Sequence, residues 1–257
     1  MVLDLFQLNG KNALVTGSRK GLGAAMALAL AQAGANVYCH GQTVASAKEV
    51  ETCKAIGGLG RRTGYLGGDV GMPEFCDRLI EATVEELGAI DILINNAGTI
   101  RRAAAAEYAW EDWQAVLRAN LDSVFRLSQG AARRMLLRGQ GGKIVNIASL
   151  LSFQGGVRVP AYAAAKGGVA QLTMALANEW AGQGINVNAI APGYMATDNT
   201  QALRDDPERS RQILERIPAG RWGRPEDLGG AAVFLCSAAS GYLHGHVMVV
   251  DGGWLGR

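Results

Sequence analysis

The chain has 257 residues, of which 49% are hydrophobic and 19% are charged, and its 25 basic residues nearly balance 23 acidic ones. A composition this apolar excludes a disordered chain. A net charge of +2 also argues against nucleic acid as the main partner, because a phosphate backbone selects a concentrated basic surface. The length suits one α/β unit, so we expect residues 1–257 to form a single domain.

The cysteines and the N-terminal segment indicate where the protein works. The four cysteines are scattered, with no Cys-x-x-Cys pair and no histidine at ligand spacing, so we expect neither a disulfide framework nor a metal site. The N-terminal segment carries Asp4 and lacks the basic start of a signal peptide. The most apolar stretch, Ala24–Ala31, is far shorter than the roughly 20 residues of a transmembrane helix. We therefore expect a cytoplasmic protein with no membrane partner.

Short runs rich in β-branched residues alternate with longer helical patterns along the chain. Strands are predicted at Asn12–Thr16, Asn36–His40, Thr63–Leu66, Ile90–Asn95, Lys143–Ala148, Asn186–Ala191 and Val247–Val250. Helices are predicted at Leu22–Ala33, Ala45–Ile56, Pro73–Leu87, Trp110–Leu137, Ala161–Ala181 and Pro225–Ser237. Several strands show little polar alternation, as expected when helices cover both faces of a parallel sheet. The order predicts an α/β fold, a Rossmann-like doubly wound parallel sheet of about seven strands.

The segment 194–224 interrupts this alternation. It is polar, rich in Arg and Asp, and follows the predicted strand at Asn186–Ala191. Ligands of open α/β sheets bind at the carboxyl ends of the strands. A long insertion at that edge is suited to cover a substrate, so we expect a substrate-covering lobe at about 194–224.

A glycine-rich turn joins the first predicted strand to the first predicted helix, with the sequence Thr16-Gly17-Ser18-Arg19-Lys20-Gly21-Leu22-Gly23. Gly17 permits a sharp turn, Gly21 lets a pyrophosphate approach the backbone, and Gly23 allows close helix packing. Phosphates would rest at the helix N-terminus, where free N–H groups and the helix dipole favour an anion. The turn predicts a dinucleotide-binding domain; a glycine turn without a ligand is the alternative.

Tyr162 and Lys166 stand four residues apart in a predicted helix, and Ser149 follows a predicted strand. On a helix the two side chains are separated by about 40° of rotation and about 6 Å of rise, so they share one side. A phenol has a pKa of about 10, too high for efficient proton exchange at neutral pH, and a neighbouring ammonium would lower it. Alone, such a pair is commonly a surface pair; with the glycine turn and Ser149 it indicates a catalytic group.

Together with Asn95-Asn96-Ala97-Gly98, Asn120 and Pro192-Gly193, these motifs have the order and spacing of the short-chain dehydrogenases/reductases. The sequence resembles that family over essentially its whole length. The resemblance implies an enzyme that transfers a hydride between a nicotinamide cofactor and a secondary alcohol or ketone. It also implies a homotetramer built from the long helices and the C-terminal strand.

The resemblance implies a role for each motif residue. Tyr162 would be the general acid/base, Lys166 would lower its pKa and bind the nicotinamide ribose, and Ser149 would orient the substrate oxygen. Asn120 would hold a water in a proton relay. The residues expected to bind the cofactor are Gly17, Ser18, Arg19, Lys20, Gly21, Leu22, Gly23, Gly41, Asp69 (adenine), Val70, Asn95 (adenosine ribose), Ala97, Gly98, Tyr162, Lys166, Pro192, Gly193, Met195 and Thr197 (nicotinamide end).

The second predicted strand indicates which cofactor is used. NAD-specific enzymes normally carry an acid at its end to bind the ribose 2′-hydroxyl. That position is Gly41, followed by Gln42, and neither is acidic. Arg19 and Lys20 instead add positive charge in the glycine turn. We therefore expect NADP(H) to be favoured over NAD(H), although the branch of the family that acts on 2-keto-3-deoxy-D-gluconate often uses NAD.

Four further segments resemble the branch that acts on 2-keto-3-deoxy-D-gluconate and 2,5-diketo-3-deoxygluconate; they are Arg101-Arg102, Leu151–Pro160, Ala191–Thr197 and Arg216–Gly223. A sugar acid needs a cationic partner, and the planar fork of arginine binds a carboxylate through two parallel bonds. We expect Arg102 and Arg158 to bind it and Gln154 to bind a sugar hydroxyl; subunit contacts or surface ion pairs are the alternative for these arginines. A 3-oxoacyl-carrier-protein reductase, a gluconate 5-dehydrogenase and a non-catalytic nucleotide sensor are the alternative functions.

Overall fold

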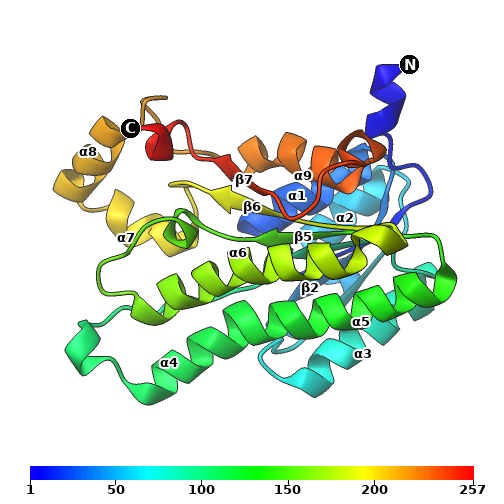
Figure 1. Ribbon diagram of the computed structural model, residues 1–257, viewed down its shortest axis with the longest axis horizontal. Coiled ribbons are helices and arrows are strands. Elements are labelled where there is room, and N and C mark those ends of the chain that lie inside the picture. The colour runs from blue at the N-terminus through cyan, green and yellow to red at the C-terminus, as the bar shows by residue number, and fades with distance from the viewer.

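A parallel sheet of seven strands runs through the middle of the computed structural model, which describes residues 1–257 (Figure 1). The strands are β1 (Asn12–Val15), β2 (Asn36–Gly41), β3 (Thr63–Gly67), β4 (Ile92–Asn95), β5 (Gly142–Ile147), β6 (Ile185–Pro192) and β7 (Val247–Val250). They lie in the order β3-β2-β1-β4-β5-β6-β7, and every neighbouring pair is parallel. The predicted Rossmann-like sheet is confirmed.

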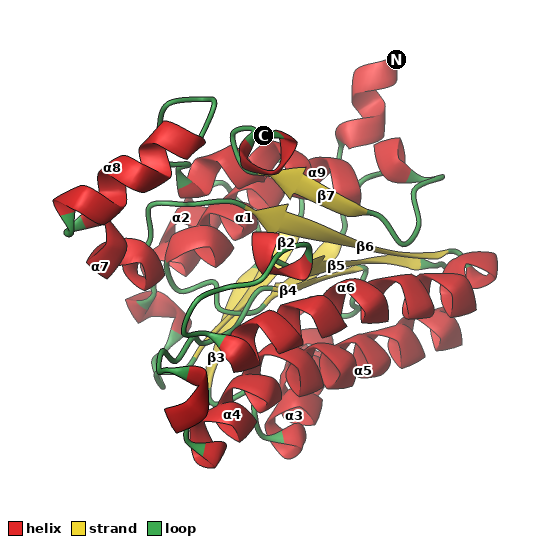
Figure 2. Ribbon diagram, turned by 60° about the vertical axis from the view of Figure 1, so that its left-hand side comes forward, coloured by secondary structure: helices red, strands yellow, loops and turns green.

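Helices cover both faces of the sheet (Figure 2). They are α1 (Gly21–Gln32), α2 (Glu51–Gly58), α3 (Pro73–Leu87), α4 (Trp110–Leu117), α5 (Ser123–Arg138), α6 (Pro160–Trp180), α7 (Gln201–Arg204), α8 (Pro207–Arg216) and α9 (Gly229–Cys236). One face packs against α1, α2 and α9, and the other against α3, α5 and α6. None of the helices combines the length and the hydropathy that crossing a lipid bilayer requires.

The central strands are buried on both sides, which explains their lack of polar alternation. In β1, Val15 faces the core under α1 and α9, while Leu14 faces the core under α3 and α5. Neither side chain is accessible to water. Burying one aliphatic side chain completely stabilises the fold by about 1.5–3 kcal/mol, so two apolar faces hold the strand in the middle layer.

Two predicted helices begin later than expected. Residues Ala47–Glu49 form a 3₁₀ turn, and α2 starts only at Glu51. Between them Val50 is extended, with φ −97° and ψ 114°, because its side chain is buried in the core beside α1. The predicted helix at Pro225–Ser237 likewise begins with a 3₁₀ turn, Pro225–Leu228, before α9.

The predicted long helix at Trp110–Leu137 contains a wider turn. Helix α4 passes into a π-helical turn at Arg118–Asp122, and α5 continues from Ser123. Such turns often occur at functional sites because the extra residue redirects a side chain. Here the turn contains Asn120, one of the predicted catalytic residues.

The segment 194–224 carries α7 and α8 beyond the end of β6 (Figure 1). Asp206 caps α8, since its Oδ1 accepts the N–H groups of Glu208 and Arg209 at 3.1 Å. The inner side of the segment is apolar. Ile213 packs with Leu150 and Trp254 in a small separate core, which attaches α8 to the residues that follow Ser149.

Candidate active site

Two cavities open where the strand order reverses, between β1 and β4. The first, here the Tyr162 cavity, has a volume of about 350 Å³ and is lined by the start of α1, Tyr162 and Lys166. The second, the His40 cavity, also has a volume of about 350 Å³ and lies at the ends of β2 and β3. Gly17 and Ala97 line both cavities, so the two adjoin. Two joined chambers at a topological switch point suit a ligand with two linked halves, such as a dinucleotide.

The glycine turn is shaped by close contacts that a larger residue could not make. Gly17 has φ +64°, and a Cβ on it would lie 2.9 Å from Asn96 Nδ2. A Cβ on Gly23 would lie 2.3 Å from the carbonyl oxygen of Gly17. The Asn96 amide holds the turn by donating to the carbonyls of Thr16 and Gly17 at 2.9 and 3.1 Å. Asn96 was not among the residues predicted to bind the cofactor, although it belongs to the Asn95-Asn96-Ala97-Gly98 motif.

The first turn of α1 faces the Tyr162 cavity without a side-chain cap. Lys20 occupies the N-cap position, and its side chain makes no capping hydrogen bond. Gly21 and Leu22 line the cavity. Their uncapped N–H groups and the positive end of the helix dipole suit a phosphate. These residues therefore fit the pyrophosphate of a dinucleotide.

Two residues predicted to bind the cofactor are buried behind the cavity walls. The Ser18 hydroxyl donates to the Val15 carbonyl at 2.7 Å and accepts the His40 N–H at 3.1 Å. The Asn95 amide donates to Ser128 and Asn146 at 3.0 and 2.9 Å. Both side chains satisfy polar groups inside the fold and are not directed into either cavity. Ser18 and Asn95 are therefore not among the residues that line the two cavities, and their cofactor contacts stay a prediction.

Arg19 and Lys20 point to different places. A Cβ on Gly41 would lie 3.1 Å from Arg19 Cβ and 2.7 Å from the Tyr65 hydroxyl, so Arg19 packs on the end of β2. An acidic side chain at Gly41 would collide with both neighbours. Lys20 forms an exposed ion pair with Asp198, and these two residues line the Tyr162 cavity. Of the two bases predicted near the adenosine ribose, only Arg19 lies at the end of β2.

The His40 cavity contains the predicted residues Asp69 and Val70. It also contains two residues that sequence reasoning missed, His40 and Arg118. The signal for His40 was its place at the end of a predicted strand, directly before Gly41. Arg118 could not be found from the sequence, because its direction depends on the π turn that it begins.

Tyr162, Ser149 and Lys166 come together as predicted. Tyr162 and Lys166 lie on α6, and the Lys166 ammonium is 5.6 Å from the centre of the Tyr162 ring. Ser149 follows β5, and its side chain is near enough to the Tyr162 phenol to lower the pKa of that phenol. Lys166 is buried and donates to the Ile147 carbonyl at 2.6 Å.

The electrostatics of this group differ from the expectation. Burial raises the pKa of Tyr162, although the bond to Ser149 and the charge of Arg102 act against that rise. Burial also lowers the pKa of Lys166 to about 8. The pKa of Tyr162 is thus raised and not lowered, because removal from water penalises both the phenolate and the ammonium.

Asn120 is completely buried in the π turn. Its amide donates to the carbonyls of Val116 and Thr99, both at 2.8 Å. Its Oδ1 has no partner and lies 2.4 Å from where a Cβ on Gly98 would be. A buried acceptor without a partner is costly, and a water molecule could satisfy it.

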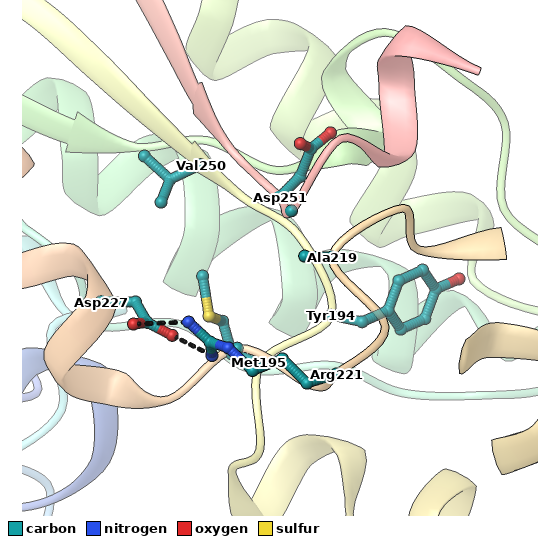
Figure 3. A pocket seen from close by; sticks show the side chains of 9 residues that line it. Tyr194, Met195, Ala219, Arg221, Asp227, Val250 and Asp251 are labelled. Carbon is teal, nitrogen blue, oxygen red and sulfur yellow. Dashed lines mark hydrogen bonds and ion pairs between the residues drawn. The ribbon is translucent and has the colours of Figure 1, made fainter. Parts of the chain in front are cut away.

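The stretch after β6 turns from the sheet toward the Tyr162 cavity. Pro192 ends β6, and a Cβ on Gly193 would lie 2.6 Å from Asp251 Cα, so both residues fix the turn. Thr197, predicted to hold the nicotinamide end of the cofactor, lines the Tyr162 cavity. The Met195 side chain instead lines a separate cavity of about 260 Å³ beneath the lobe, beside an Arg221–Asp227 ion pair (Figure 3). The expected cofactor contact of Met195 is thus not formed by its side chain.

The residues predicted to bind the substrate lie on two loops, and Arg102, Gln154 and Arg158 are not among the residues that line the Tyr162 cavity. Arg102 donates to the carbonyl of Asn199, which lines the cavity, at 3.0 Å. Arg158 is exposed and has φ +64°, a strained value for a residue with a side chain. Its carbonyl accepts the Ala103 N–H at 3.1 Å, which places the backbones of both loops together. Gln154 Oε1 accepts the Trp254 indole N–H at 3.3 Å.

Arg101, the neighbour of Arg102 in the same segment, lies elsewhere. It lines the His40 cavity and forms an ion pair with Asp112 at 2.7 Å. It therefore belongs to the wall of the other chamber.

Known proteins resemble this chain over its whole length. A family model described as enoyl-(acyl carrier protein) reductase matches residues 17–255. The chain is 53% identical to the 2-dehydro-3-deoxy-D-gluconate 5-dehydrogenase of Escherichia coli K12, over 257 residues and 100% of both chains. A solved Agrobacterium tumefaciens structure with bound NADP, provisionally named a 2-deoxy-D-gluconate 3-dehydrogenase, matches with a TM-score of 0.91 and 52% identity over 99% of this chain and 100% of that one. A Burkholderia cenocepacia gluconate 5-dehydrogenase, solved with NADP and tartrate, matches with a TM-score of 0.94 and 40% identity over 100% of both chains.

These similarities agree with the parallel sheet, the glycine turn and the tyrosine and lysine that line one cavity, with Ser149 near the tyrosine. The protein belongs to the short-chain dehydrogenase/reductase family of oxidoreductases.

Proposed function

We propose that the protein is an NADP(H)-preferring dehydrogenase that interconverts a secondary alcohol and a ketone on a deoxy keto sugar acid. The substrate is of the 2-keto-3-deoxy-D-gluconate or 2,5-diketo-3-deoxygluconate type. The observation that carries this proposal is the Tyr162 phenol, which lies with Lys166 in a cavity that begins at the uncapped end of α1 and is influenced by Ser149 and the charge of Arg102. The 53% identity to the E. coli enzyme supports the substrate.

Tyr162 and Ser149 act on the reacting oxygen. When a substrate alcohol is oxidised, its hydroxyl proton passes to the Tyr162 phenolate; when a ketone is reduced, the phenol returns that proton. The Ser149 hydroxyl hydrogen-bonds to the same oxygen and so stabilises the charge that develops there. A bound nicotinamide cofactor supplies the hydride acceptor or donor.

Lys166 and Asn120 maintain the protonation state of Tyr162. With a pKa lowered to about 8, Lys166 can exchange a proton near neutral pH. We assign the unpartnered Oδ1 of Asn120 to a water molecule of the relay that links this group to solvent. Lys166 also holds the nicotinamide ribose.

The preference for NADP(H) rests on Arg19. Its side chain packs on Gly41, where an NAD-specific enzyme would place an acid. Because Gly41 carries no acidic side chain, nothing at this position repels a 2′-phosphate. The nearby guanidinium of Arg19 would attract it. Gln42 and Val70 line the chamber that would receive the adenosine half.

The substrate carboxylate binds to Arg102 and Arg158, and Gln154 presents its free amide nitrogen to a sugar hydroxyl. The segment 194–224 covers the substrate. Support comes from the residues just before α7, since Thr197 and Asn199 line the Tyr162 cavity. A cover of this kind would exclude water from the reacting atoms.

We also propose a cytoplasmic homotetramer. Phe125 is 45% exposed beside a wide apolar groove between α5 and α6, and Val249 is 39% exposed on the outer strand β7. Leu121 and Leu172 line the same groove. Exposed apolar surface on long helices suits contact with further copies of the chain.

The decisive experiment measures kcat/KM by the absorbance of reduced nicotinamide, for NADPH and NADH in parallel, over a panel of keto-deoxy and aldonic sugar acids. The highest value is expected with a 3-deoxy keto sugar acid. The panel includes 5-keto-D-gluconate, because the Burkholderia structure is a gluconate 5-dehydrogenase, and a 3-oxoacyl thioester, because the matching family model describes acyl-carrier-protein reductases. If kcat/KM is higher on 5-keto-D-gluconate or on the 3-oxoacyl thioester than on every 3-deoxy keto sugar acid, the proposed substrate is wrong. Specific nucleotide binding without turnover of any substrate would indicate a sensor.

A further inference from the structure

His40 connects three segments around the two cavities, and only 3% of its surface is exposed. Its Nδ1 accepts the backbone N–H of Gly17 at 3.1 Å, and its Nε2 bonds to the carbonyl of Gly68 at 3.0 Å. Its backbone N–H donates to the Ser18 hydroxyl at 3.1 Å, and its carbonyl accepts the Ser18 N–H at 2.8 Å. The end of β2 thus holds both the glycine turn after β1 and the loop after β3.

The two partners of the ring require one neutral tautomer. The Gly68 carbonyl can only accept a hydrogen bond, so Nε2 carries the hydrogen. The Gly17 N–H can only donate, so Nδ1 offers its lone pair. An imidazolium has hydrogens on both nitrogens, and its Nδ1–H would face the Gly17 N–H. Protonation therefore removes the bond to Gly17 and sets two donors against each other.

Gly17 cannot absorb this change without disturbing the site. It has φ +64°, and its Cα lies against Ala97 and the Asn96 amide on one side. Its carbonyl faces Gly23 in the first turn of α1. Movement of Gly17 away from His40 therefore shifts the turn that presents the start of α1 to the Tyr162 cavity.

The surroundings of His40 favour the neutral ring. Burial lowers its pKa, while the bond to Gly68 and the charge of Asp69 oppose that change. Arg101 and Arg118 line the same cavity, and the Phe75 ring of α3 packs beside His40 with its centre 5.6 Å away. Arg19, the nearest charge in the glycine turn, packs on Gly41. The folded site thus requires neutral His40, which is available above the lowered pKa and lost as pH falls through it.

We propose that His40 is a positioning residue that keeps the glycine turn competent for the cofactor only while its ring is neutral, so that acid weakens cofactor binding. The proposal rests on the dinucleotide site proposed above and adds a residue that transfers neither hydride nor proton. It makes cofactor affinity depend on pH through a group outside the Tyr162 cavity.

A pair of matched variants separates the two bonds of the ring. In His40→Asn the side-chain carbonyl takes the position of Nδ1, so the bond from Gly17 is kept and the titration is removed. In His40→Gln the amide nitrogen reaches the position of Nε2, so the bond to Gly68 is kept and the one from Gly17 is lost. The dissociation constant of NADPH is measured by fluorescence titration between about pH 5 and pH 8, which requires no turnover.

Below the pKa of His40, the dissociation constant of the wild-type protein is expected to rise about tenfold per pH unit. The 2′-phosphate of NADPH itself titrates with a pKa of about 6, but it does so equally for every variant. His40→Asn should therefore keep only that shallower dependence and bind about as tightly as the wild type at about pH 8. His40→Gln should bind about three- to tenfold more weakly at about pH 8. Thermal unfolding at that pH checks that both variants are folded.

If the dissociation constant of NADPH depends on pH in His40→Asn as it does in the wild type, the inference is overturned. It is also overturned if His40→Gln binds NADPH as tightly as the wild type at about pH 8. Either result leaves the proposed function intact. A wild-type protein that binds neither NADPH nor NADH at high pH overturns the proposed function and this inference with it.

Discussion

The two bases of the glycine turn provide a matched test of cofactor choice. Arg19→Leu and Lys20→Leu each remove one exposed positive charge from adjacent positions. Only Arg19 packs on Gly41 at the end of β2, whereas Lys20 pairs with Asp198 beside the Tyr162 cavity. If Arg19 binds the 2′-phosphate, its loss removes a charge-assisted bond of about 1.5–3 kcal/mol, or roughly 10- to 150-fold in affinity.

The assay compares kcat/KM for NADPH and NADH in the wild type and in both variants. Arg19→Leu should lower the NADPH value by roughly 10- to 150-fold and leave the NADH value within about threefold. Lys20→Leu should change both values by a similar factor, because the pyrophosphate near it is common to both cofactors. The assignment is refuted if the wild type prefers NADH. It is equally refuted if Arg19→Leu lowers both values alike.

Tyr162→Phe should lower kcat by about 10²- to 10⁴-fold with nearly unchanged NADPH affinity, since only the proton donor is lost; turnover above about a tenth of wild type would contradict this. Arg158→Leu should lower kcat/KM on the sugar acid by roughly 10- to 150-fold and spare an analogue whose carboxylate is reduced to an alcohol. Equal losses on both substrates would make Arg158 structural. Phe125→Asp should dissociate the assembly in sedimentation experiments, because it puts a charge into the apolar groove between α5 and α6; an unchanged sedimentation coefficient would place the interface elsewhere.

Features that depend on local periodicity could be predicted from the sequence. Tyr162 and Lys166 share a helix side because they are four residues apart, and the parallel arrangement of the sheet follows from the alternation of strands and helices. Gly17 and Gly23 were recognisable because only glycine permits their contacts with the backbone and with Asn96. In each case the pattern along the chain is enough to indicate the feature, although the contacts of Gly17 include Asn96, which is 79 residues away.

Features that depend on distant partners could not be predicted. Lys20 turns toward Asp198, 178 residues away, while the adjacent Arg19 turns toward β2. Asn95 enters the interior because Ser128 and Asn146 on neighbouring elements accept its amide hydrogens. The π turn that directs Asn120 has the same periodic signal as an ordinary helix, and its extra residue is visible only in the folded chain.

Arg102 differs from Arg158 because its charge also acts on the phenol of Tyr162, whose pKa it lowers against the effect of burial. A substrate carboxylate bound to Arg102 neutralises that charge, whereas the analogue with an alcohol in place of the carboxylate leaves the charge unneutralised. Arg102→Leu should therefore raise the pKa of Tyr162 and move the rising limb of kcat for alcohol oxidation to higher pH, because the phenolate accepts the proton. The displacement should be larger with the uncharged analogue than with the sugar acid, and Arg158→Leu should produce none. Identical pH profiles in wild type and Arg102→Leu with the uncharged analogue would show that this charge does not influence the phenol.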